Sequence, residues 1–162
     1  MELNTLATRA VALLRDKGLT VATAESCTGG LIAAAITDVA GASRVFGTGV
    51  VSYCNDCKMK LLGVSPDTLA AEGAVSAATA AEMAQGVRRV GDAAIGVSVT
   101  GEAGPIAAEN HPVGIVFIGL ADAGGTVTEE HQFDGDRAAI RRQAAETVLS
   151  LLIRRLEGVE VC

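Results

Sequence analysis

Residues 93–100 form an almost entirely apolar segment, and an irregular loop that begins at Gly101 follows it. A strand with apolar side chains on both faces belongs in the middle of a sheet that is covered on both sides. Sheets of α/β proteins have this property, because the helices that connect parallel strands lie on both faces. The segment therefore predicts a central strand in an α/β domain.

Other segments of the chain alternate between strand and helix patterns. Apolar residues recur at the spacing of one helix face from residue 5 to residue 17, and Gly18 is placed to end that helix. By the same reasoning we expect strands at 19–24, 47–53, 93–100, 113–121 and 127–133. We expect helices at 5–17, 31–38, 55–62, from Pro66, at 77–89 and at 137–156, with N-caps at Asn4 or Thr5, Ser65, Ser76 and Asp136.

The connections between these segments predict the kind of sheet. Helices between successive strands indicate a largely parallel sheet with helices on both faces. The last three expected strands have short connections, so part of the sheet should be antiparallel. The chain has 162 residues and shows no linker or repeat, so we expect one domain over residues 1–162. Only 2% of its residues are aromatic, and Ala, Val, Leu and Ile must therefore fill the core.

Charge and hydropathy exclude several classes of partner. The formal net charge is −6 and no run of basic residues occurs, which argues against a nucleic-acid partner. No apolar stretch approaches the roughly 20 residues that a membrane-spanning helix needs, so we expect no membrane partner. The amino terminus lacks the basic and apolar regions of a secretory signal. We therefore expect a cytoplasmic protein.

The chain contains four cysteines, Cys27, Cys54, Cys57 and Cys162. Residues 54–57 form a CxxC motif, which is found in redox proteins and as half of a zinc site. No second CxxC motif or histidine pair completes a metal site, because the two histidines stand alone in the sequence. We therefore expect no metal and free thiols in a reducing compartment, with a redox protein as the alternative.

The turn at residues 24–30, Ala-Glu-Ser-Cys-Thr-Gly-Gly, lies between an expected strand and an expected helix. Backbone N–H groups at the start of a helix favour an anion, and Gly29 and Gly30 would let one approach closely. Thr28 or Ser26 would instead satisfy backbone donors if the turn were only a helix cap. Ser26 would act as a nucleophile if a base lay near it.

Three further groups of polar residues follow expected strands or begin a helix. Tyr53, Asn55 and Lys58 follow the second strand, where ligands gather in open α/β sheets, and a buried Lys58 would be a base for Ser26. The alternative is an exposed helix with Lys58 in water. The remaining groups are Thr100 with Gly101, which end the central strand, and Arg137 with Arg141 at the last helix, which would bind a phosphate or remain surface charges.

These groups should meet in one place. Ser26, Tyr53 and Thr100 each lie at or just beyond the end of a strand in successive units. Side chains at the carboxyl ends of such strands converge on one pocket. The sequence therefore predicts a single site built from several weak signals.

At these residues the chain resembles the C-terminal domain of the CinA family (competence/damage-inducible protein A), also known as nicotinamide-nucleotide amidohydrolase. The resemblance covers almost the whole chain in the family's order, beginning with the motif Thr-Ala-Glu-Ser-Cys-Thr-Gly-Gly. The matching segments are 23–30, 51–53 with Asn55 and Lys58, 62–64, 73–76, 99–101 with 103–105, 112–114 and 135–137. The resemblance implies a three-layer α/β/α sandwich with a mixed, mostly parallel sheet.

The resemblance also implies an activity. Proteins of this family hydrolyse nicotinamide mononucleotide to nicotinic acid mononucleotide and ammonia, without a metal or an organic cofactor, and look like homodimers. By position, Ser26 would be the nucleophile or the group that positions it, Lys58 the proton acceptor and Tyr53 an assisting group. Asn55, Thr100 and Gly101 would line the substrate pocket. Thr28, Gly29 and Gly30, together with Arg137 or Arg141, would hold the phosphate.

The chain departs from the family pattern in two respects. The longer family members carry an amino-terminal domain that resembles a molybdopterin-binding domain, and we expect this chain to be a stand-alone form. The loop at 102–111 has Glu102 where the family usually has isoleucine, and Glu109 adds a second carboxylate. This loop suggests an alternative function, a non-catalytic nucleotide-binding or regulatory relative.

Overall fold

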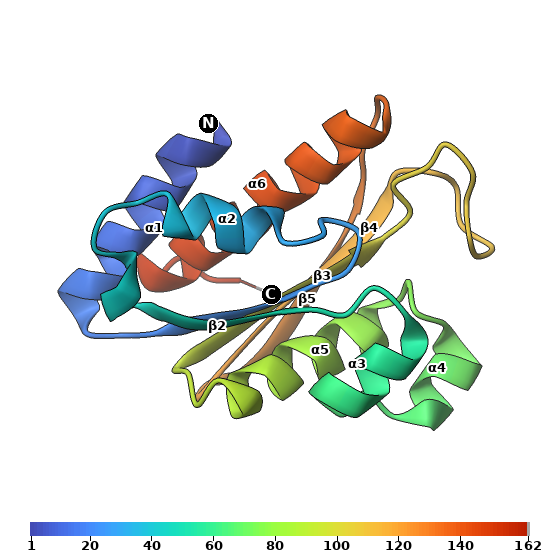
Figure 1. The fold of residues 1–162 in the computed structure, drawn as a ribbon, viewed down its shortest axis with the longest axis horizontal. Helices are drawn as coiled ribbons and strands as arrows, with labels where there is room; N and C mark the ends of the chain where they lie inside the picture. The colour runs from blue at the N-terminus through green and yellow to red at the C-terminus, as the bar shows by residue number, and fades with distance from the viewer. Residues whose placement is uncertain (162) are drawn as a thin grey trace.

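The computed structural model describes residues 1–161, and Cys162 lies outside the described residues. One five-stranded sheet forms the centre of the molecule (Figure 1). Its strands are β1 (Val21–Glu25), β2 (Phe46–Val51), β3 (Ile95–Gly101), β4 (Ile115–Asp122) and β5 (Gly125–Gln132). The helices are α1 (Leu3–Lys17), α2 (Leu31–Thr37), α3 (Asn55–Leu62), α4 (Pro66–Glu72), α5 (Ala77–Val90) and α6 (Arg137–Leu156), with a 3-10 turn at Ala42–Arg44.

The strands lie in the order β2-β1-β3-β4-β5. Strand β1 pairs in parallel with β2 and with β3, whereas β4 pairs antiparallel with β3 and with β5. The expected mixed, mostly parallel sheet is confirmed, including its antiparallel part in the last three strands. The expected apolar segment is β3, the middle strand, which is buried along almost its whole length.

Helices cover both faces of the sheet, as expected. Figure 1 shows α1, α2 and α6 on one face and α3, α4 and α5 on the other. The larger core lies under the first group of helices and contains aliphatic side chains such as Leu14, Ile36, Ile118 and Leu149. A smaller core under α5 joins Met83 and Val87 to the small side chains of β1. Packing of small side chains allows the three layers to approach closely.

Capping residues explain most of the helix boundaries. Gly18 ends α1 with φ of 66°, a conformation that glycine adopts at little cost. The side chains of Ser65, Ser76 and Asp136 each accept a hydrogen bond from a backbone N–H in the first turn of α4, α5 and α6. The expected cap of α1 at residue 4 or 5 is wrong. That helix begins at Leu3, and Glu2 precedes it without a side-chain cap.

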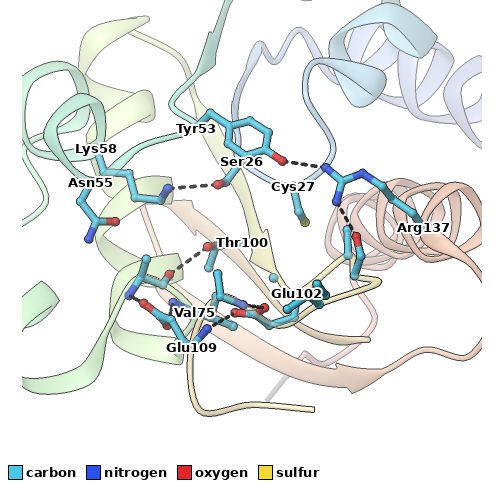
Figure 2. Close-up of a pocket in the computed structure, with 16 residues that line it drawn as sticks. Ser26, Cys27, Tyr53, Asn55, Lys58, Val75, Thr100, Glu102, Glu109 and Arg137 are labelled. Atoms are coloured by element: carbon cyan, nitrogen blue, oxygen red, sulfur yellow. Dashed lines mark hydrogen bonds between the residues drawn. The ribbon is translucent and has the colours of Figure 1, made fainter. Parts of the chain in front are cut away.

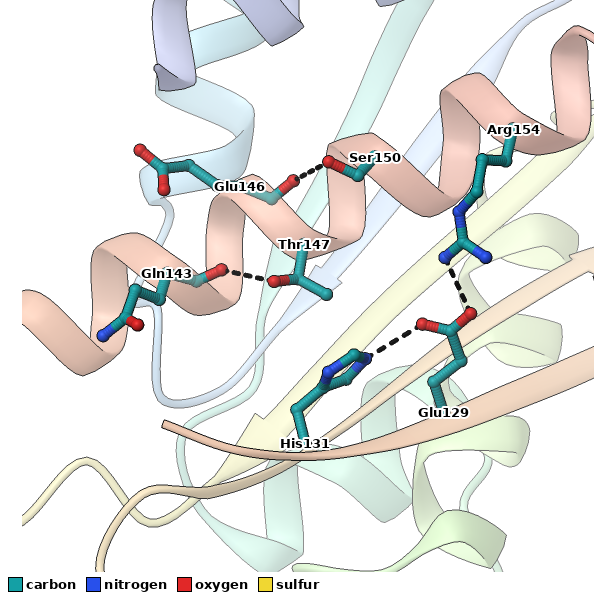
Figure 3. A network of polar contacts seen from close by, with 7 residues as sticks. All are labelled: Glu129, His131, Gln143, Glu146, Thr147, Ser150 and Arg154. Atoms are coloured by element: carbon teal, nitrogen blue, oxygen red, sulfur yellow. Dashed lines mark hydrogen bonds and ion pairs between the residues drawn. The ribbon is translucent and has the colours of Figure 1, made fainter. Parts of the chain in front are cut away.

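An ion pair fastens the edge strand β5 to α6. Figure 3 shows Glu129 of β5 between Arg154 of α6 and His131 of the same strand. Arg154 Nη2 donates to Glu129 Oε1 at 2.7 Å, and His131 Nε2 lies 2.9 Å from Glu129 Oε2. Burial acts to raise the pKa of Glu129, but the two hydrogen bonds outweigh it and hold that pKa below its usual value. His131 therefore has a structural role.

The order of the strands places a crevice at one edge of the sheet. The chain leaves β1 through α2 on one face to reach β2, and it returns from β2 to β3 through α3, α4 and α5 on the other face. Strands β1 and β3 are neighbours, but the chain continues from β1 to β2 on one side of this pair and from β3 to β4 on the other side. Ligands of open α/β sheets bind at such a point, outside the carboxyl ends of the strands.

Candidate active site

A cavity of about 320 Å³ opens at this crevice. Its size falls within the range of small-molecule sites. Seven of the residues expected from the sequence line it, namely Ser26, Tyr53, Asn55, Lys58, Thr100, Gly101 and Arg137. Thr28, Gly29, Gly30 and Arg141, which were expected to hold a phosphate, do not line it. The structure therefore brings these strand ends together at one cavity, which Thr28, Gly29 and Gly30 do not reach.

The central contact of the cavity joins Lys58 to Ser26. Lys58 Nζ lies 3.0 Å from Ser26 Oγ and donates a hydrogen bond of 2.9 Å to the carbonyl oxygen of Ser52. Figure 2 shows the lysine side chain reaching from α3 toward Ser26, which directly follows β1. Lys58 is only 1% exposed. The alternative of an exposed helix with Lys58 in water is therefore excluded.

Burial sets the ionisation of this lysine. The pKa of Lys58 lies below its usual value of 10.5, because burial disfavours the charged ammonium. The neighbouring Cys54, Cys27 and Glu109 act to raise this pKa and are smaller effects than burial. A lowered pKa makes the neutral amine more available at moderate pH, and a neutral amine can take a proton from Ser26.

A buried carboxylate holds the turn that carries Ser26. Glu25 is the last residue of β1 and is 1% exposed. Its carboxylate accepts hydrogen bonds from Thr28 Oγ1 at 2.6 Å, from the backbone N–H of Ile32 at 2.9 Å and from that of Ala33 at 3.0 Å. The last two donors belong to the first turn of α2. The chain's own carboxylate thus occupies the positive end of this helix.

This arrangement argues against the expectation that Thr28, Gly29 and Gly30 hold a phosphate. The anion at the start of α2 is Glu25, and Thr28 is fully buried with its hydroxyl bonded to that carboxylate. Gly29 and Gly30 have φ of 62° and 104°, so they serve the sharp turn between strand and helix. Arg141 Nε and Nη2 donate to the carbonyl oxygens of Cys27 and Thr28, both at 3.0 Å. Arg141 therefore braces the turn from outside the cavity.

The remaining arginine lies at the mouth of the cavity. Arg137 Nη2 donates to the hydroxyl of Tyr53 at 2.8 Å, and Arg137 Nη1 donates to the carbonyl oxygen of Gly104 at 2.6 Å. Figure 2 shows the Tyr53 hydroxyl turned toward Arg137, away from Lys58. Tyr53 is 59% exposed. Its hydroxyl thus belongs to the rim, and the sequence did not reveal this pairing.

Thr100 and Gly101 form the floor at the end of β3. Thr100 is 1% exposed, and its hydroxyl donates to the carbonyl oxygen of Ala74 at 2.8 Å, which ties β3 to the segment before α5. Gly101 packs against β4, where an added Cβ would lie only 2.7 Å from Val116 Cγ2. Glycine is therefore required by close packing at this position. Asn55 lines the opposite wall from the first position of α3.

The loop at 102–111 forms the third wall, and its two carboxylates hold it in place. Glu102 is 3% exposed and accepts hydrogen bonds from the backbone N–H groups of Ala108 at 2.6 Å and Glu109 at 3.1 Å. Glu109 in turn accepts from the N–H groups of Ala74 at 2.8 Å and Val75 at 2.9 Å. Both carboxylates are therefore paired with backbone donors, which offsets the cost of burying Glu102 and half-burying Glu109.

Comparison with known proteins places this chain in a family. The family model that describes the CinA C-terminal domain matches residues 3–156 of this chain. The chain belongs to the CinA family.

Relatives of this CinA domain are close in sequence. A CinA-like protein of Geobacter sulfurreducens is 50% identical over 154 residues, which are 94% of this chain and 37% of that protein. A putative competence-damage inducible protein of Desulforamulus reducens is 49% identical over 146 residues, which are 90% of this chain and 36% of that protein. The chain thus spans a little over a third of the length of these CinA relatives.

Solved structures of CinA proteins share the fold over almost their whole length. A CinA superfamily protein from Klebsiella pneumoniae superposes with a TM-score of 0.95 at 34% identity, covering 98% of this chain and 99% of that one. A competence/damage-inducible protein from Agrobacterium tumefaciens gives a TM-score of 0.91 at 41% identity, covering 97% and 96%. These names establish the family and leave the reaction to be argued from the site.

Other features of this CinA domain concern metals and membranes. Across residues 1–161, no group of three or more His, Cys, Asp or Glu side chains is arranged to hold a metal ion. His111 packs edge-on against Phe117, so it too has a packing role. No helix within the same residues is both long and apolar enough to span a membrane.

Sequence reasoning did not assign Glu25 a role. It expected Glu25 in the turn, but the residue ends β1 and holds the start of α2. A signal was present, because a carboxylate three residues before Thr28 and seven before Ile32 can reach the first turn of the following helix. The carbonyl oxygen of Ser52, which holds Lys58, left no such signal, since any residue would supply it.

Proposed function

We propose that this chain is a nicotinamide-nucleotide amidohydrolase, which converts nicotinamide mononucleotide and water to nicotinic acid mononucleotide and ammonia. The observation that carries the proposal is the 3.0 Å contact between Lys58 Nζ and Ser26 Oγ within a cavity. A serine hydroxyl is a weak nucleophile until a neighbouring base takes its proton. A buried lysine with a lowered pKa is such a base.

In the first half of the proposed reaction, Ser26 Oγ attacks the carbonyl carbon of the nicotinamide carboxamide. Lys58 Nζ takes the serine proton as the new C–O bond forms. Collapse of the tetrahedral intermediate breaks the C–N bond, and Lys58 gives its proton to the leaving nitrogen, which departs as ammonia. The bond from Lys58 to the carbonyl oxygen of Ser52 keeps the amine aimed at Ser26 during these transfers.

In the second half, water hydrolyses the ester on Ser26. Lys58 takes a proton from the water as its oxygen attacks the ester carbonyl. The C–O bond to Ser26 then breaks, and the proton returns to Ser26 Oγ, which restores the starting state. The product is the carboxylic acid, and no metal or organic cofactor enters either half.

Of the groups that the sequence suggested as partners of the substrate phosphate, Arg137 is the one that lies free of the turn at 24–30. Arg141 is engaged by the carbonyl oxygens of the Ser26 turn, and the start of α2 holds Glu25. Arg137 is the arginine that lines the cavity. We therefore assign the phosphate to Arg137, with Tyr53 beside it at the rim, while the carboxamide enters toward Ser26.

The test is release of ammonia from nicotinamide mononucleotide by the purified protein. We expect Ser26→Ala and Lys58→Met to lower kcat by about 100-fold to 10,000-fold. Lys60→Met is the matched control, because Lys60 is an exposed lysine on the same helix and should leave the rate unchanged. Ammonia release that does not exceed that of Ser26→Ala would reject the amidase.

Calorimetry with the same nucleotide separates the amidase from the alternative suggested by the 102–111 loop. A non-catalytic relative would bind the nucleotide and release no ammonia, and Ser26→Ala would bind it equally well. An amidase should show turnover in the wild type and binding alone in Ser26→Ala. If neither protein bound the nucleotide, both functions would be rejected.

A further inference from the structure

Two thiols meet at the edge of the cavity. Cys54 is the N-cap of α3, and Cys57 lies in the first turn of that helix. Their sulfur atoms are 3.1 Å apart, and the backbone N–H of Cys57 donates to Cys54 Sγ at 3.4 Å. Both cysteines are free, and their sulfur atoms already lie in contact.

We propose that Cys54 and Cys57 form a reversible thiol–disulfide site, which closes an intramolecular disulfide by exchange with low-molecular-weight disulfides. The Cys54 thiolate attacks one sulfur of the small disulfide, forms a mixed disulfide and expels one small thiolate. Cys57 then loses its proton and attacks the Cys54 sulfur, which expels the second small thiolate. Two electrons pass from the protein thiols to the small disulfide, which leaves as two thiols.

The surroundings of the two sulfur atoms assign Cys54 as the attacking thiol. Cys54 is exposed, whereas Cys57 is partly buried. The hydrogen bond between the two thiols, followed by that from the Cys57 backbone N–H, lowers the pKa of Cys54, while the same pairing raises the pKa of Cys57. A thiol at the start of a helix that is exposed and favoured as thiolate is the reactive kind.

The third described cysteine provides an internal contrast. Cys27 is 4% exposed, and burial raises the pKa of its thiol to about 12. A buried thiol that stays protonated exchanges slowly with disulfides. Reaction should therefore be confined to the pair on α3 while the protein remains folded.

The dithiol shares its segment with the cavity. Tyr53 and Asn55, the neighbours of Cys54 on either side, both line the cavity. The backbone N–H of Lys58 donates to the carbonyl oxygen of Cys54 at 3.1 Å. The helical turn that a disulfide would cross-link is therefore the turn that carries Lys58.

The experiment uses the folded chain with Cys162→Ser, which leaves three thiols. The reduced protein is incubated with glutathione disulfide, quenched with acid, unfolded, alkylated and measured by intact mass and peptide mapping. We expect the loss of two hydrogen atoms, a link between residues 54 and 57, and one alkylated thiol at Cys27. In the same background, Cys57→Ser should accumulate glutathione on Cys54, and Cys54→Ser should react at least about tenfold more slowly.

Two results would overturn the proposal. One is that all three thiols stay alkylatable under conditions that oxidise a free dithiol such as dithiothreitol. The other is that glutathione accumulates on Cys57 in Cys54→Ser as fast as it does on Cys54 in Cys57→Ser. Neither readout involves ammonia release, so the site stands or falls independently of the proposed amidase.

Discussion

Replacement of Glu25 tests whether its carboxylate holds the start of α2 and the turn that carries Ser26. The side chain is 1% exposed and accepts three hydrogen bonds, from Thr28, Ile32 and Ala33. Glu25→Ala leaves all three donors without this acceptor. Glu25→Gln keeps one acceptor oxygen but turns an NH2 group toward donors. Thr28→Val removes one donor and keeps the shape of the side chain.

The expected losses follow from the number of stranded donors. Each buried donor left unpaired costs about 1–3 kcal/mol, and solvent that enters the space of the lost side chain lowers the sum. We expect Glu25→Ala to reduce the free energy of unfolding by about 4 kcal/mol and Glu25→Gln by about 2 kcal/mol. Thr28→Val should cost about 1 kcal/mol, because it removes a single hydrogen bond.

Urea unfolding at neutral pH, followed by circular dichroism, measures these differences. Domains of this size have a total stability of about 5–15 kcal/mol, so Glu25→Ala can be too unstable to analyse, and Glu25→Gln then carries the test. A stability of Glu25→Gln within about 0.5 kcal/mol of wild type would refute the reasoning. Because Ser26 adjoins the disturbed turn, ammonia release by Glu25→Gln should also fall by about tenfold.

Three further predictions follow from other groups. Burial lowers the pKa of Lys58 below 10.5, so the unfolded chain binds more protons than the folded chain between the folded pKa and 10.5. The free energy of unfolding should therefore rise with pH over that interval. Urea unfolding at several pH values should show this rise in the wild type and not in Lys58→Met. Hydrogen bonds from Arg155 lower the pKa of Asp122 below 3.8, so their stabilisation is present above 3.8 and is lost as pH falls through the folded pKa. Asp122→Asn should cost about 1 kcal/mol at neutral pH and flatten the acid limb of the stability curve, and an unchanged limb would contradict this. Glu109→Gln should weaken the anchor of the 102–111 loop by about 1.4 kcal/mol, which makes amide hydrogen exchange in that loop about tenfold faster; equal rates in both proteins would show that other contacts hold it.

The sequence predicted helices more sharply than strands, and capping explains the difference. The helices at 55–62 and 137–156 agree with the structure residue for residue, because Gly63 ends the first and Asp136 caps the second. The ends of strands depend on the register with their partners. Strand β1 was expected at 19–24, but its pairing with β2 and β3 extends from Val21 to Glu25. A glutamate is unfavourable inside a buried strand, so the sequence did not place Glu25 in β1. It is tolerated there because backbone N–H groups of the following helix, at Ile32 and Ala33, donate to its carboxylate.

The convergence of Ser26, Tyr53 and Thr100 could be predicted, because the ends of neighbouring parallel strands share one edge of a sheet. The contact between Lys58 and Ser26 could not, since it depends on the angle at which α3 lies against the sheet. The prediction that Thr28, Gly29 and Gly30 hold a phosphate failed for a related reason. Whether a helix start is free to bind an anion depends on where every nearby carboxylate points, and here Glu25 turns toward it.

The two hydrogen bonds that Arg137 donates, to Tyr53 and to Gly104, join three segments that are far apart in the chain. A substrate phosphate would draw on the same guanidinium N–H groups. If Arg137 holds the phosphate as proposed, arrival of the substrate would exchange the partners of this side chain, and the phosphate would displace the Tyr53 hydroxyl or the Gly104 carbonyl oxygen. The hydrogen bonds at the mouth of the cavity would break as the substrate binds and re-form as the product leaves. The same few hydrogen bonds would then set both the affinity for the substrate and its access to the cavity.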